Sequence, residues 1–420
     1  MQEIKVDPYG IKIMLPKGIT HLIRLDSITN IAANILKQEM LSLGGEVAVS
    51  RNALTGRMRK TDCILMGNLS QINRLNDKLK KQPFGLDKLG GDLSKGLANY
   101  QRDNFTFDLG KYKLSLGRRT HIMGIVNLTP DSFSGDGLYQ VAGREVSQVA
   151  DIIDFVEKMV RDGADVIDVG GESSRPGAKA VPIKEELTRT IPVIKALAKK
   201  VKVPISIDTY KPEVARQALD NGAVIVNDIT ALKNPKMAKI VARYKAGVVI
   251  MHMKGDPRTM QKNPTYASLI DEIIEYLDKA INVAIGRGID REKIIVDPGI
   301  GFGKTLGHNL EILKNLRELK ILGRPILVGP SRKSFIGKIL NVEPRERIFG
   351  PSATFCFDRL SIRPERPKGV EGLRTNGERS RIIGSVSSCV LAAENGANIV
   401  RVHDVLEIKQ ALKVLNAINR

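Results

Sequence analysis

From residue 121 to the end of the chain, short apolar runs alternate with longer stretches in which apolar residues recur every three or four positions. Near-continuous Val- and Ile-rich runs are typical of strands buried on both faces of a parallel sheet, and the longer period is typical of amphipathic helices. The runs lie at 121–127, 164–170, 203–209, 223–228, 246–253, 293–299, 324–329 and 398–404, and the helical periods at 145–162, 184–200, 211–220, 268–287 and 308–320. Eight strands, each followed by a helix, predict an α/β fold of the (β/α)8 type, a TIM barrel, rather than an open doubly wound sheet.

Two further regions precede the predicted barrel. Residues 105–116 alternate with the period of a strand around an Asp-Leu-Gly-Lys turn, which predicts a hairpin that closes the bottom of the barrel. Residues 1–92 predict a separate small α/β domain whose role stays open, followed by a linker over 93–104. Its strand-like segments lie at 20–25 and 62–67, and its helix-like segments at 28–45 and 70–81. The barrel then extends over 105–420, with an insert at 351–379 that is rich in Arg, Pro and Gly and has no clean period.

The composition is that of a soluble globular protein, with 42% hydrophobic and 27% charged residues. No apolar run approaches the ~20 residues that span a bilayer, and the first residues lack the basic and apolar regions of a signal peptide. The three cysteines, Cys63, Cys356 and Cys389, are scattered, which favours reduced thiols over a disulfide framework or a zinc site. These features predict a cytoplasmic protein with no membrane partner.

The formal net charge of +20 indicates attraction to anions, whether a nucleic acid, a membrane surface or a phosphorylated small molecule. Lys and Arg are spread along the chain rather than gathered in one tract, and only 4% of the residues are aromatic, with no Trp. Platforms on which bases stack are therefore sparse. We expect a solvated basic surface and no nucleic-acid partner.

Every predicted barrel strand ends in polar or charged residues. The carboxyl ends of the strands form the active face of such a barrel, whereas the opposite face contributes to stability. A single Asp at a strand end is more often structural than catalytic, but polar groups at all eight ends are hard to explain as turns or caps. In chain order these groups are Asn127 with 129–137, then 170–177, Asp208 with Thr209, Asn227 with Asp228, His252, Asp297 with 298–304, 330–335, and Arg401 with His403.

The chemistry of these groups favours a nitrogen heterocycle together with an oxyanion. Asp208, Asn227 and Asp297 offer acceptors and amide donors that suit a ring with several N–H groups and a carbonyl. Lys333 and Arg401 add positive charge, and the planar guanidinium can stack on a ring. The residues that suit the oxyanions of phosphate or pyrophosphate are Arg175, Lys304, Ser331, Arg332 and His403, with the glycine-rich turns.

Asn127 and Asp131 are oxygen donors of the kind that helps to hold Mg²⁺, an ion bound mainly by substrate phosphates and water. The few His and Cys residues do not favour a transition-metal cluster, and no nucleophile–base pair such as Ser-His-Asp stands out. The segment 299–304 has neither the complete spacing of a phosphate-binding P-loop nor that of a dinucleotide motif. The chemistry implied is positioning, anion stabilisation and departure of a leaving group.

Eight motifs at these strand ends resemble, in chain order, those of the dihydropteroate synthase family. They are MGIVNLTPDSFSGDG (123–137), DVGGESSRPGA (168–178), ISIDT (205–209), NDI (227–229), MHMKG (251–255), DPGIGFGK (297–304), SRKSFIG (331–337) and RVHDV (401–405). Any one motif is weak, but all eight in order are highly specific. The resemblance covers residues 105–420 apart from the insert and implies a pterin-binding TIM barrel.

The resemblance implies a transferase, usually dimeric, that joins 6-hydroxymethyl-7,8-dihydropterin pyrophosphate to 4-aminobenzoate on the route to folate. The products are 7,8-dihydropteroate and pyrophosphate. The implied mechanism is SN1-like: pyrophosphate leaves first, and the weakly nucleophilic arylamine captures the pterin methylene cation. We therefore expect small-molecule substrates, Mg²⁺ as the cofactor, a homodimer, and a site that sulfonamides target.

The resemblance also implies a role for each matched residue. The pterin ligands are implied to be Asp208, Asn227, Asp297, Lys333 and Arg401; the pyrophosphate ligands Asn127, Arg175, Arg401 and His403; and the aminobenzoate contacts Phe133, Ser174, Arg175, Pro176, Gly177, Phe302 and Ser334. The implied catalytic residues are Asp131, Arg175, Lys333, Arg401 and His403, and the implied metal ligand is Asn127. The segments around Asp131 and Arg175 are expected to become ordered only when substrates bind.

The chain departs from the family pattern in three places. Ser174 stands where many members have Thr, a change that keeps the hydroxyl. The 1–92 domain lies outside the common core. The insert at 351–379 follows the seventh strand on the catalytic face, before a helix expected to begin near Arg381, and two interpretations of it stay open: a disordered bulge, and a basic flap near the pyrophosphate.

Two alternative functions belong to other classes. A pterin-binding barrel that transfers a methyl group from methyltetrahydrofolate to a corrinoid protein would share the pterin-facing Asp and Asn. It would not need residues 173–177 or 331–335, and the chain has no DxHxxG cobalamin signature. The other alternative is a non-catalytic pterin-binding scaffold whose N-terminal domain carries the function, and intact motifs at every strand end argue against it.

Overall fold

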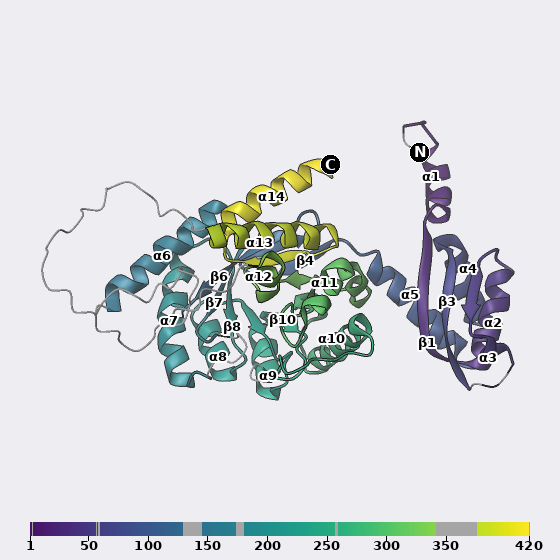
Figure 1. Ribbon diagram of the computed structural model, residues 1–420, viewed down its shortest axis with the longest axis horizontal. Coiled ribbons are helices and arrows are strands. Elements are labelled where there is room, and N and C mark those ends of the chain that lie inside the picture. The colour runs from purple at the N-terminus through teal and green to yellow at the C-terminus, as the bar shows by residue number, and fades with distance from the viewer. Residues whose placement is uncertain are drawn as a thin grey trace, which may run out of the picture. The chain divides into compact units, whose positions relative to one another are not determined.

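Figure 1 shows the computed structural model of the chain, which describes residues 1, 3–55, 57, 59–128, 145–173, 180–256, 259–341 and 376–419. The chain forms two compact units, Met1–Gln101 and Arg102–Arg420. No helix among the described residues is long and apolar enough to cross a membrane.

The first unit is a small α/β domain built on a three-stranded antiparallel sheet in the order β1-β3-β2. Its helices bury apolar side chains against the sheet, and Leu36, Val47, Leu65 and Leu75 are fully buried in this core. The elements are α1 (Pro8–Met14), η1 (Leu15–Lys17), β1 (Thr20–Thr29), α2 (Asn30–Leu41), β2 (Glu46–Val49), α3 (Arg51–Leu54), β3 (Lys60–Asn68), α4 (Leu69–Leu79) and α5 (Leu86–Tyr100).

The stretch predicted as a linker over 93–104 is helical as far as Tyr100, because it is the second half of α5. Leu93 and Leu97 are buried in the core of the first unit. Glycine has a packing role earlier in the same helix: a Cβ on Gly90 would lie 3.2 Å from Cβ of Leu79, so glycine lets α5 approach α4 closely.

The second unit is the predicted (β/α)8 barrel. Its eight strands run parallel in the order β11-β10-β9-β8-β7-β6-β13-β12, and a parallel bridge between Val296 and Ile326 closes the ring. The strands are β6 (His121–Asn127), β7 (Val166–Gly170), β8 (Ile205–Asp208), β9 (Ile225–Asp228), β10 (Gly247–Met251), β11 (Ile294–Asp297), β12 (Leu327–Val328) and β13 (Ile399–Val402). Each lies within one of the eight apolar runs of the sequence.

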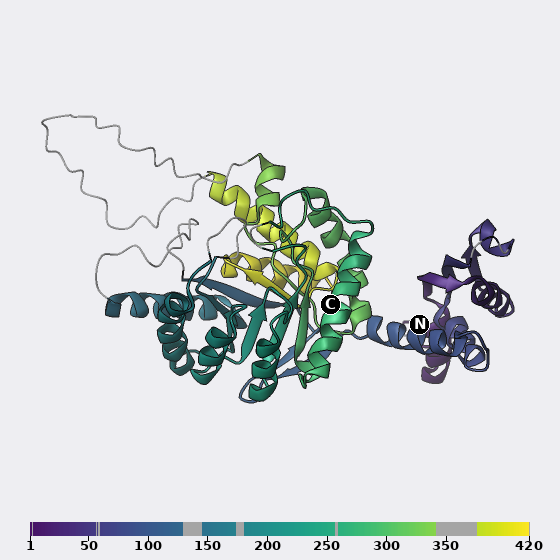
Figure 2. The ribbon, with the colours of Figure 1, turned by 90° about the horizontal axis from the view of Figure 1, so that it is seen from below.

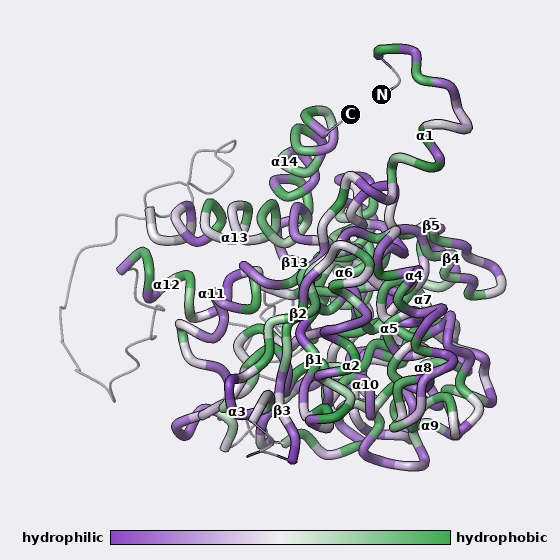
Figure 3. Tube along the Cα trace, turned by 90° about the vertical axis from the view of Figure 1, so that its right-hand side faces the viewer, coloured by the Kyte–Doolittle hydropathy of each residue, from purple (hydrophilic) through white to green (hydrophobic). Residues whose placement is uncertain are grey.

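Helices cover the outside of the barrel (Figures 1 and 2). Along α14, for example, hydrophobic and hydrophilic positions alternate as an amphipathic helix requires (Figure 3). The helices are α6 (Glu145–Asp162), α7 (Ile183–Lys200), α8 (Pro212–Asp220), α9 (Pro235–Tyr244), α10 (Leu269–Gly286), α11 (Leu306–Lys314), α12 (Ser334–Leu340), α13 (Asn376–Glu394) and α14 (Val405–Ile418), with short 3₁₀ helices η2 (Arg291–Lys293) and η3 (Leu316–Leu322). The helix predicted over 308–320 is thus divided at Asn315.

A hairpin closes the amino-terminal end of the barrel, as the sequence predicts. It consists of β4 (Phe105–Asp108) and β5 (Lys113–Leu116), which pair antiparallel. Phe107 and Leu116 are fully buried and form one apolar cluster with Met123 and Val166 from the bottom of the strands.

Inward-facing residues change from apolar to polar along each strand. On β13 the sequence from bottom to top is Ile399 and then Arg401; on β11 it is Ile295 and then Asp297. The residues between them face the outer helices, because side chains alternate along a strand. The barrel is therefore sealed by hydrocarbon at its amino-terminal end and polar at its carboxyl end, where the sequence analysis expects the site.

Candidate active site

Four polar side chains from four strands meet inside the carboxyl end of the barrel. Arg401 donates from Nε to Oδ2 of Asp168 at 2.6 Å and from Nη2 to Oδ2 of Asp208 at 2.7 Å. Asn227 donates from Nδ2 to the same Oδ2 of Asp168 at 3.1 Å. The structure thus brings together three predicted pterin ligands, Asp208, Asn227 and Arg401, through a fourth residue to which the sequence analysis assigned no role.

Burial raises the pKa of two carboxyl groups in this site. The pKa of Asp208 rises to about 7 because its carboxylate is desolvated, with the Arg401 charge opposing the rise and the Asp168 charge adding to it. Desolvation likewise raises the pKa of Asp297, although Oδ1 accepts a 2.7 Å hydrogen bond from the Gly299 amide and Lys333 lies near. The fold therefore keeps these two carboxyl groups in a desolvated environment that disfavours their ionised form.

Lys304 lies beneath this site and is only 2% exposed. Its Nζ is 2.9 Å from Nδ1 of His252 and donates to the carbonyl oxygens of Phe302 at 3.0 Å and His252 at 3.3 Å. In this structure the donors of Lys304 are directed to protein groups, and its expected phosphate role stays a prediction. Burial lowers the pKa of Lys304 to about 7, and burial beside this lysine lowers that of His252 to about 2, so the imidazole is neutral.

Lys333 and Phe302 lie next to each other across two loops. Nζ of Lys333 is 4.1 Å from the centre of the Phe302 ring, a cation–π distance. Gly301 has a φ of +81°, and a Cβ there would lie 3.2 Å from Cδ of Lys333, so glycine leaves room for the lysine stem. Ser334 is the exposed first residue of α12, directly after Lys333. These three predicted residues therefore share one side of the site.

His403 follows β13 and contacts the segment after β12. Its Nδ1 lies 3.2 Å from Oγ of Ser331, and its backbone amide donates to the same hydroxyl. Arg332 forms an ion pair with Asp404, with Nε–Oδ2 and Nη2–Oδ1 distances of 2.9 and 2.5 Å. The guanidinium of Arg332 thus binds a carboxylate of the chain, and its expected phosphate role stays a prediction.

Asn127 ends β6 beside the carboxylate cluster. A Cβ on Gly170 would lie 3.6 Å from Oδ1 of Asn127 and 3.5 Å from Cβ of Asp208, so the bare glycine separates these two side chains. Asn127 is half-buried and presents an oxygen that suits Mg²⁺. Among the residues that the structure describes, no three His, Cys, Asp or Glu side chains come together in a way that could hold a metal ion.

Several predicted site residues lie outside the described residues, as does the insert up to residue 375. These site residues are Asp131, Phe133, Ser174, Arg175, Pro176 and Gly177. The segment 376–379, at the end of the predicted insert, forms the first turn of α13.

The sequence analysis missed a buried ionic cluster next to β7. Lys211 binds Oε2 of Glu186 at 2.5 Å, the carbonyl oxygen of Val181 at 2.6 Å, and the carboxylate of Glu172. Tyr210 donates to Oε1 of Glu172 at 2.9 Å. Lys211 and Glu186 are buried within predicted helices, where a charged residue on the apolar face is the signal that could have found them.

Asp168 was missed for a different reason. It belongs to a motif quoted for the resemblance, but a buried Asp within an apolar run gives no sign of its partner. The signal that could have found it is strand parity, since Asp168 faces the same way as Gly170, at the strand end, and Val166, inside the barrel. Because Asp168 binds both Arg401 and Asn227, it belongs to the site.

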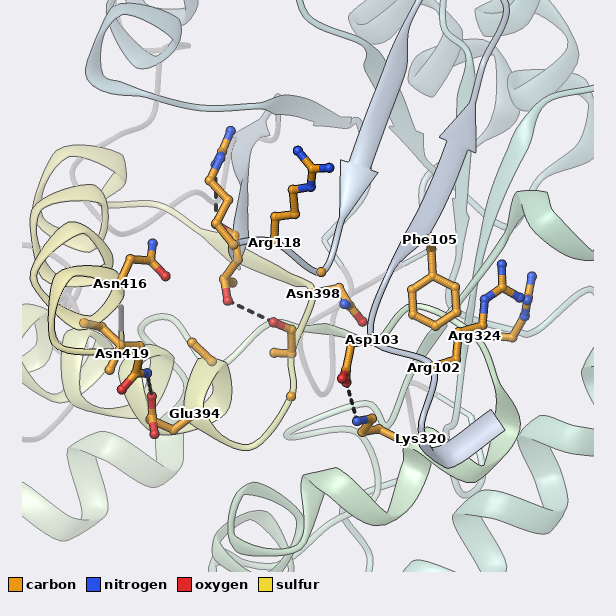
Figure 4. Close-up of a pocket in the computed structure, with 17 residues that line it drawn as sticks. Arg102, Asp103, Phe105, Arg118, Lys320, Arg324, Glu394, Asn398, Asn416 and Asn419 are labelled. Carbon is orange, nitrogen blue, oxygen red and sulfur yellow. Dashed lines mark hydrogen bonds and ion pairs between the residues drawn. The ribbon is translucent and has the colours of Figure 1, made fainter. Parts of the chain in front are cut away.

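A cavity of about 310 Å³ lies at the opposite, amino-terminal end of the barrel (Figure 4). Five basic residues line it, with two acidic ones: Arg102, Arg118, Arg119, Lys320 and Arg324, with Asp103 and Glu394. Nη2 of the buried Arg324 donates to Glu292 at 2.8 Å, Arg119 binds Asp165, and Lys320 binds Asp103. Four of these five cations, all except Arg118, thus bind acidic residues of the chain, and none of the predicted site residues that the structure describes lines the cavity.

The family described as "Pterin binding enzyme" matches residues 123–359 of the chain. The dihydropteroate synthase of Synechocystis sp. is 43% identical over 314 residues, which are 74% of this chain and 94% of that protein. A probable bifunctional folylpolyglutamate synthase/dihydropteroate synthase of Halobacterium salinarum is 37% identical over 99% of this chain, and the chain spans 45% of its length. Similarity to the second relative therefore extends over the first unit as well as the barrel.

Solved structures of the same kind share the fold. The Yersinia pestis dihydropteroate synthase in a sulfonamide drug complex has a TM-score of 0.61 and 36% identity, covering 73% of this chain and 97% of its own. The Xanthomonas albilineans dihydropteroate synthase in complex with 7,8-dihydropteroate has a TM-score of 0.59 and 34% identity, covering 75% of this chain and 98% of its own.

Proposed function

Because the chain belongs to the dihydropteroate synthase family of pterin-binding enzymes, we propose that its barrel joins 6-hydroxymethyl-7,8-dihydropterin pyrophosphate to 4-aminobenzoate. The products are 7,8-dihydropteroate and pyrophosphate, and the chain is a transferase. The observation that carries the proposal is the buried group of Asp208, Asn227 and Arg401 at the carboxyl end of the barrel. The relatives bear the synthase name, so neither the methyltransferase nor the scaffold alternative is favoured.

The pterin ring binds to the acceptors and donors inside the barrel. Asp208 and Asp297 accept from the ring N–H groups, Asn227 supplies an amide, and Lys333 donates to the ring. The guanidinium of Arg401 offers a planar cation for stacking on the ring. Support for these roles is that Asn227 and Asp297 are buried and Asp208 is largely buried, on β9, β11 and β8, with β10 lying between β9 and β11 in the barrel.

The pyrophosphate leaves from the rim of the barrel. Asn127, Arg401 and His403 bind its oxygens together with Arg175, and Asn127 lies beside Asp208 across the bare Gly170. The aminobenzoate lies against Phe302 and Ser334 on the side of the site that Lys333 occupies, and Phe133, Ser174, Arg175, Pro176 and Gly177 complete this pocket. The Phe302 ring with Lys333 Nζ above it suits an aromatic acid, since it combines an apolar face with a positive charge.

The residues present fit Mg²⁺, because Asn127 gives a neutral oxygen and the substrate gives the phosphate oxygens that this ion prefers. Asn127 is the residue of the described chain that would hold it. When bound, the ion neutralises charge on the departing pyrophosphate.

The side chains favour departure of the leaving group before attack. Arg401 and His403 stabilise negative charge on the pyrophosphate, while Asp208 and Asp297 stabilise the electron-poor ring by accepting its N–H groups. Buried carboxylates with raised pKa values do this in a site that excludes water from the cation. Asp131 contributes to stabilising the cation from the segment after β6. The arylamine then attacks an activated carbon, so no strong general base is needed. The barrel is proposed to act as a homodimer.

The test is release of pyrophosphate from purified protein given pterin pyrophosphate, 4-aminobenzoate and Mg²⁺. We expect release above the blank that lacks aminobenzoate, and release no greater than this blank would overturn the proposal. Asp208→Ala and Lys333→Ala should each abolish turnover with the circular-dichroism spectrum unchanged. Lys320→Ala, at the other end of the barrel, is the matched control and should turn over normally.

A further inference from the structure

Asp168 is a carboxylate to which the proposed function gives no ligand. It lies in the middle of β7 and is 0% exposed. Its neighbours Ile167 and Val169 pack in the outer core, so its side chain faces the interior of the barrel. Gly170, two residues further along, pairs with Asp208. Asp168 therefore lies one layer below the proposed pterin ligands.

We propose that Asp168 is a positioning residue for the pterin, one that holds the Arg401 guanidinium and the Asn227 carboxamide in the orientations in which they meet the ring. This inference rests on the proposed function, because it takes Asp208, Asn227 and Arg401 as pterin ligands. The geometry that carries it is a single oxygen atom, Oδ2 of Asp168, which accepts from both residues.

The contact with Asp168 fixes which way the Asn227 amide faces. A carboxylate only accepts hydrogen bonds, so the group turned to Asp168 is the NH₂ of Asn227, at 3.1 Å. Turning the amide over would place two oxygens against each other in a buried layer, which is strongly unfavourable. The amide oxygen of Asn227 is consequently left as an acceptor for an N–H of the ligand, and this sets the hydrogen-bond pattern that the ring must match.

The contact with Asp168 also leaves the positive charge of Arg401 with a negatively charged partner when a ligand occupies the site. Nη2 of Arg401 binds Oδ2 of Asp208, so a ring N–H that binds this oxygen competes with the arginine for it. The bond from Nε to Asp168 lies in the layer below and is not exposed to that competition. Asp168 can therefore hold the plane and the charge of the guanidinium while Asp208 engages the ring, and a buried cation without such a partner would be destabilised.

The same layer contains two buried polar atoms without a hydrogen-bond partner among the described residues. They are Oδ1 of Asp168 and Oγ of Ser206, and the two residues occupy paired positions on β7 and β8. Buried polar atoms are nearly always paired, so each is held here at an energetic cost. Asp168 is nevertheless bound through Oδ2 to Arg401 and Asn227, which accounts for a carboxylate in this layer, whereas the Ser206 hydroxyl has no such contact among the described residues.

The test compares the full-length wild type with Asp168→Asn in steady-state kinetics for both substrates. Asn has nearly the same size but lacks the charge that holds Arg401. We expect the KM for pterin pyrophosphate to rise by about 10- to 100-fold, as for other residues that orient a ligand-binding side chain, and the KM for 4-aminobenzoate to stay within about twofold. This split between the two KM values is not the result of a general loss of structure.

Ser206→Ala is the matched control. Ser206 lies at the paired position of the neighbouring strand, is equally buried and also carries an unpartnered oxygen, but has no hydrogen bond to Arg401 or Asn227 among the described residues. We expect both KM values of this variant to stay within about twofold of the wild type, since removing an unpartnered buried hydroxyl breaks no bond.

A pH profile gives a second readout. Burial raises the pKa of Asp208, the charges of Asp168 and Glu186 raise it further, and those of Arg401 and Lys333 oppose the rise. Asp168→Asn removes one of the negative charges that raise the pKa of Asp208. Asp208 is then the remaining carboxylate of the pair that binds Arg401. The acid limb of kcat/KM for the pterin substrate should therefore move to lower pH, a shift that loosened packing alone would not produce.

An unchanged KM for pterin pyrophosphate together with an unmoved acid limb overturns the positioning role. If Asp168→Asn does not fold, Asp168→Glu takes its place: it keeps the charge but displaces the carboxylate by one methylene, so the same rise in KM is expected and a wild-type KM overturns the role. The wild-type assay separates the two proposals. A wild type that releases no pyrophosphate defeats the proposed function, whereas an active wild type with a normal Asp168 variant defeats only this inference.

Discussion

The two ends of the barrel differ in the partners of their buried charged side chains. At the amino-terminal end, Arg119 holds Asp165 through distances of 2.8 and 2.5 Å, and Arg102 and Arg324 share Glu292. At the carboxyl end, Asp297 and Lys304 are both buried, but their hydrogen bonds go to neutral groups of the chain. The amino-terminal end pairs each of these acids with an arginine. At the carboxyl end Arg401 is paired with Asp168 and Asp208, but Asp297 and Lys304 form no ion pair among the described residues.

The pKa values follow this difference. Burial would raise the pKa of Asp165 and Glu292, but hydrogen bonds from arginines outweigh it and hold both below the usual value. At the carboxyl end burial prevails, so that the pKa of Asp297 is raised and that of Lys304 falls to about 7. The paired charges at the amino-terminal end therefore stabilise the fold, whereas the charges of Asp297 and Lys304 at the carboxyl end oppose it, and Asp297 is the one of these two that is proposed to bind the ligand.

Of the variants that test this difference between the two ends, Asp297→Asn should have the largest effect, and the effect is on activity. The variant keeps the shape and the acceptor for the Gly299 amide but removes the charge. We expect kcat/KM to fall by about 100-fold, since a hydrogen bond to a charged group is worth about 3 kcal/mol, with Tm unchanged or higher because a disfavoured charge is gone. Kinetics and thermal unfolding check this. Normal turnover, or a large fall in Tm, would contradict the contrast between the two ends.

Asp165→Ala should have the opposite outcome. It removes the carboxylate that Arg119 and the Ile122 amide bind, and this carboxylate is mostly buried. We expect the free energy of unfolding to fall by about 1 to 3 kcal/mol, with kcat/KM within about twofold of the wild type. Urea unfolding and the pyrophosphate assay measure the two quantities. A loss of activity without a loss of stability would show that the amino-terminal end contributes to the reaction.

The contrast also explains what the sequence could predict. The eight strands, the hairpin and the inward direction of Asp208, Asn227 and Asp297 follow from local patterns, because parallel strands are apolar and their ends meet at one face. The pairing of charges is a property of tertiary contacts between strands far apart in sequence. Asp168 and Arg401 are separated by 233 positions and meet only when the barrel closes, so neither pattern nor period could predict the pair.

The same limit applies to the protein contacts of two expected phosphate residues and to the linker. Lys304 and Arg332 follow strands at the active face, as a phosphate ligand would, but the fold directs one to His252 and the other to Asp404. The stretch 93–104, predicted as a linker, is helical to Tyr100, and Leu93 and Leu97 are buried in the core of the first unit.

A smaller effect should appear in the pH dependence of stability. The pKa of Lys304 is about 7 in the folded protein and near 10.5 in the unfolded chain, so between these values the unfolded chain binds more protons. The stability that neutral Lys304 contributes is therefore present above pH 10.5 and is lost as pH falls towards 7. Lys304→Met removes this titration, and we expect the free energy of unfolding to rise less steeply with pH above 7 than in the wild type. Denaturant unfolding from pH 7 to 9.5 measures both slopes, and equal slopes would contradict the assignment.

The smallest effect is expected for Arg118→Gln, which tests whether cations at the amino-terminal end act through partners or through their charge alone. Arg118 is exposed, lines the cavity of Figure 4 and has no hydrogen bond or ion pair with the residues that the structure describes. If pairing is what matters at this end, its loss should change the free energy of unfolding by no more than about 0.5 kcal/mol and leave the KM for pterin pyrophosphate within about twofold. Repeating the kinetics at low ionic strength sharpens the test, because the field of an exposed charge is strongest there. A KM that rises in Arg118→Gln only at low salt would show that the basic end attracts the anionic substrate from a distance. The two ends would then differ in how their charges are paired, but both would contribute to the electrostatic field that acts on the substrate.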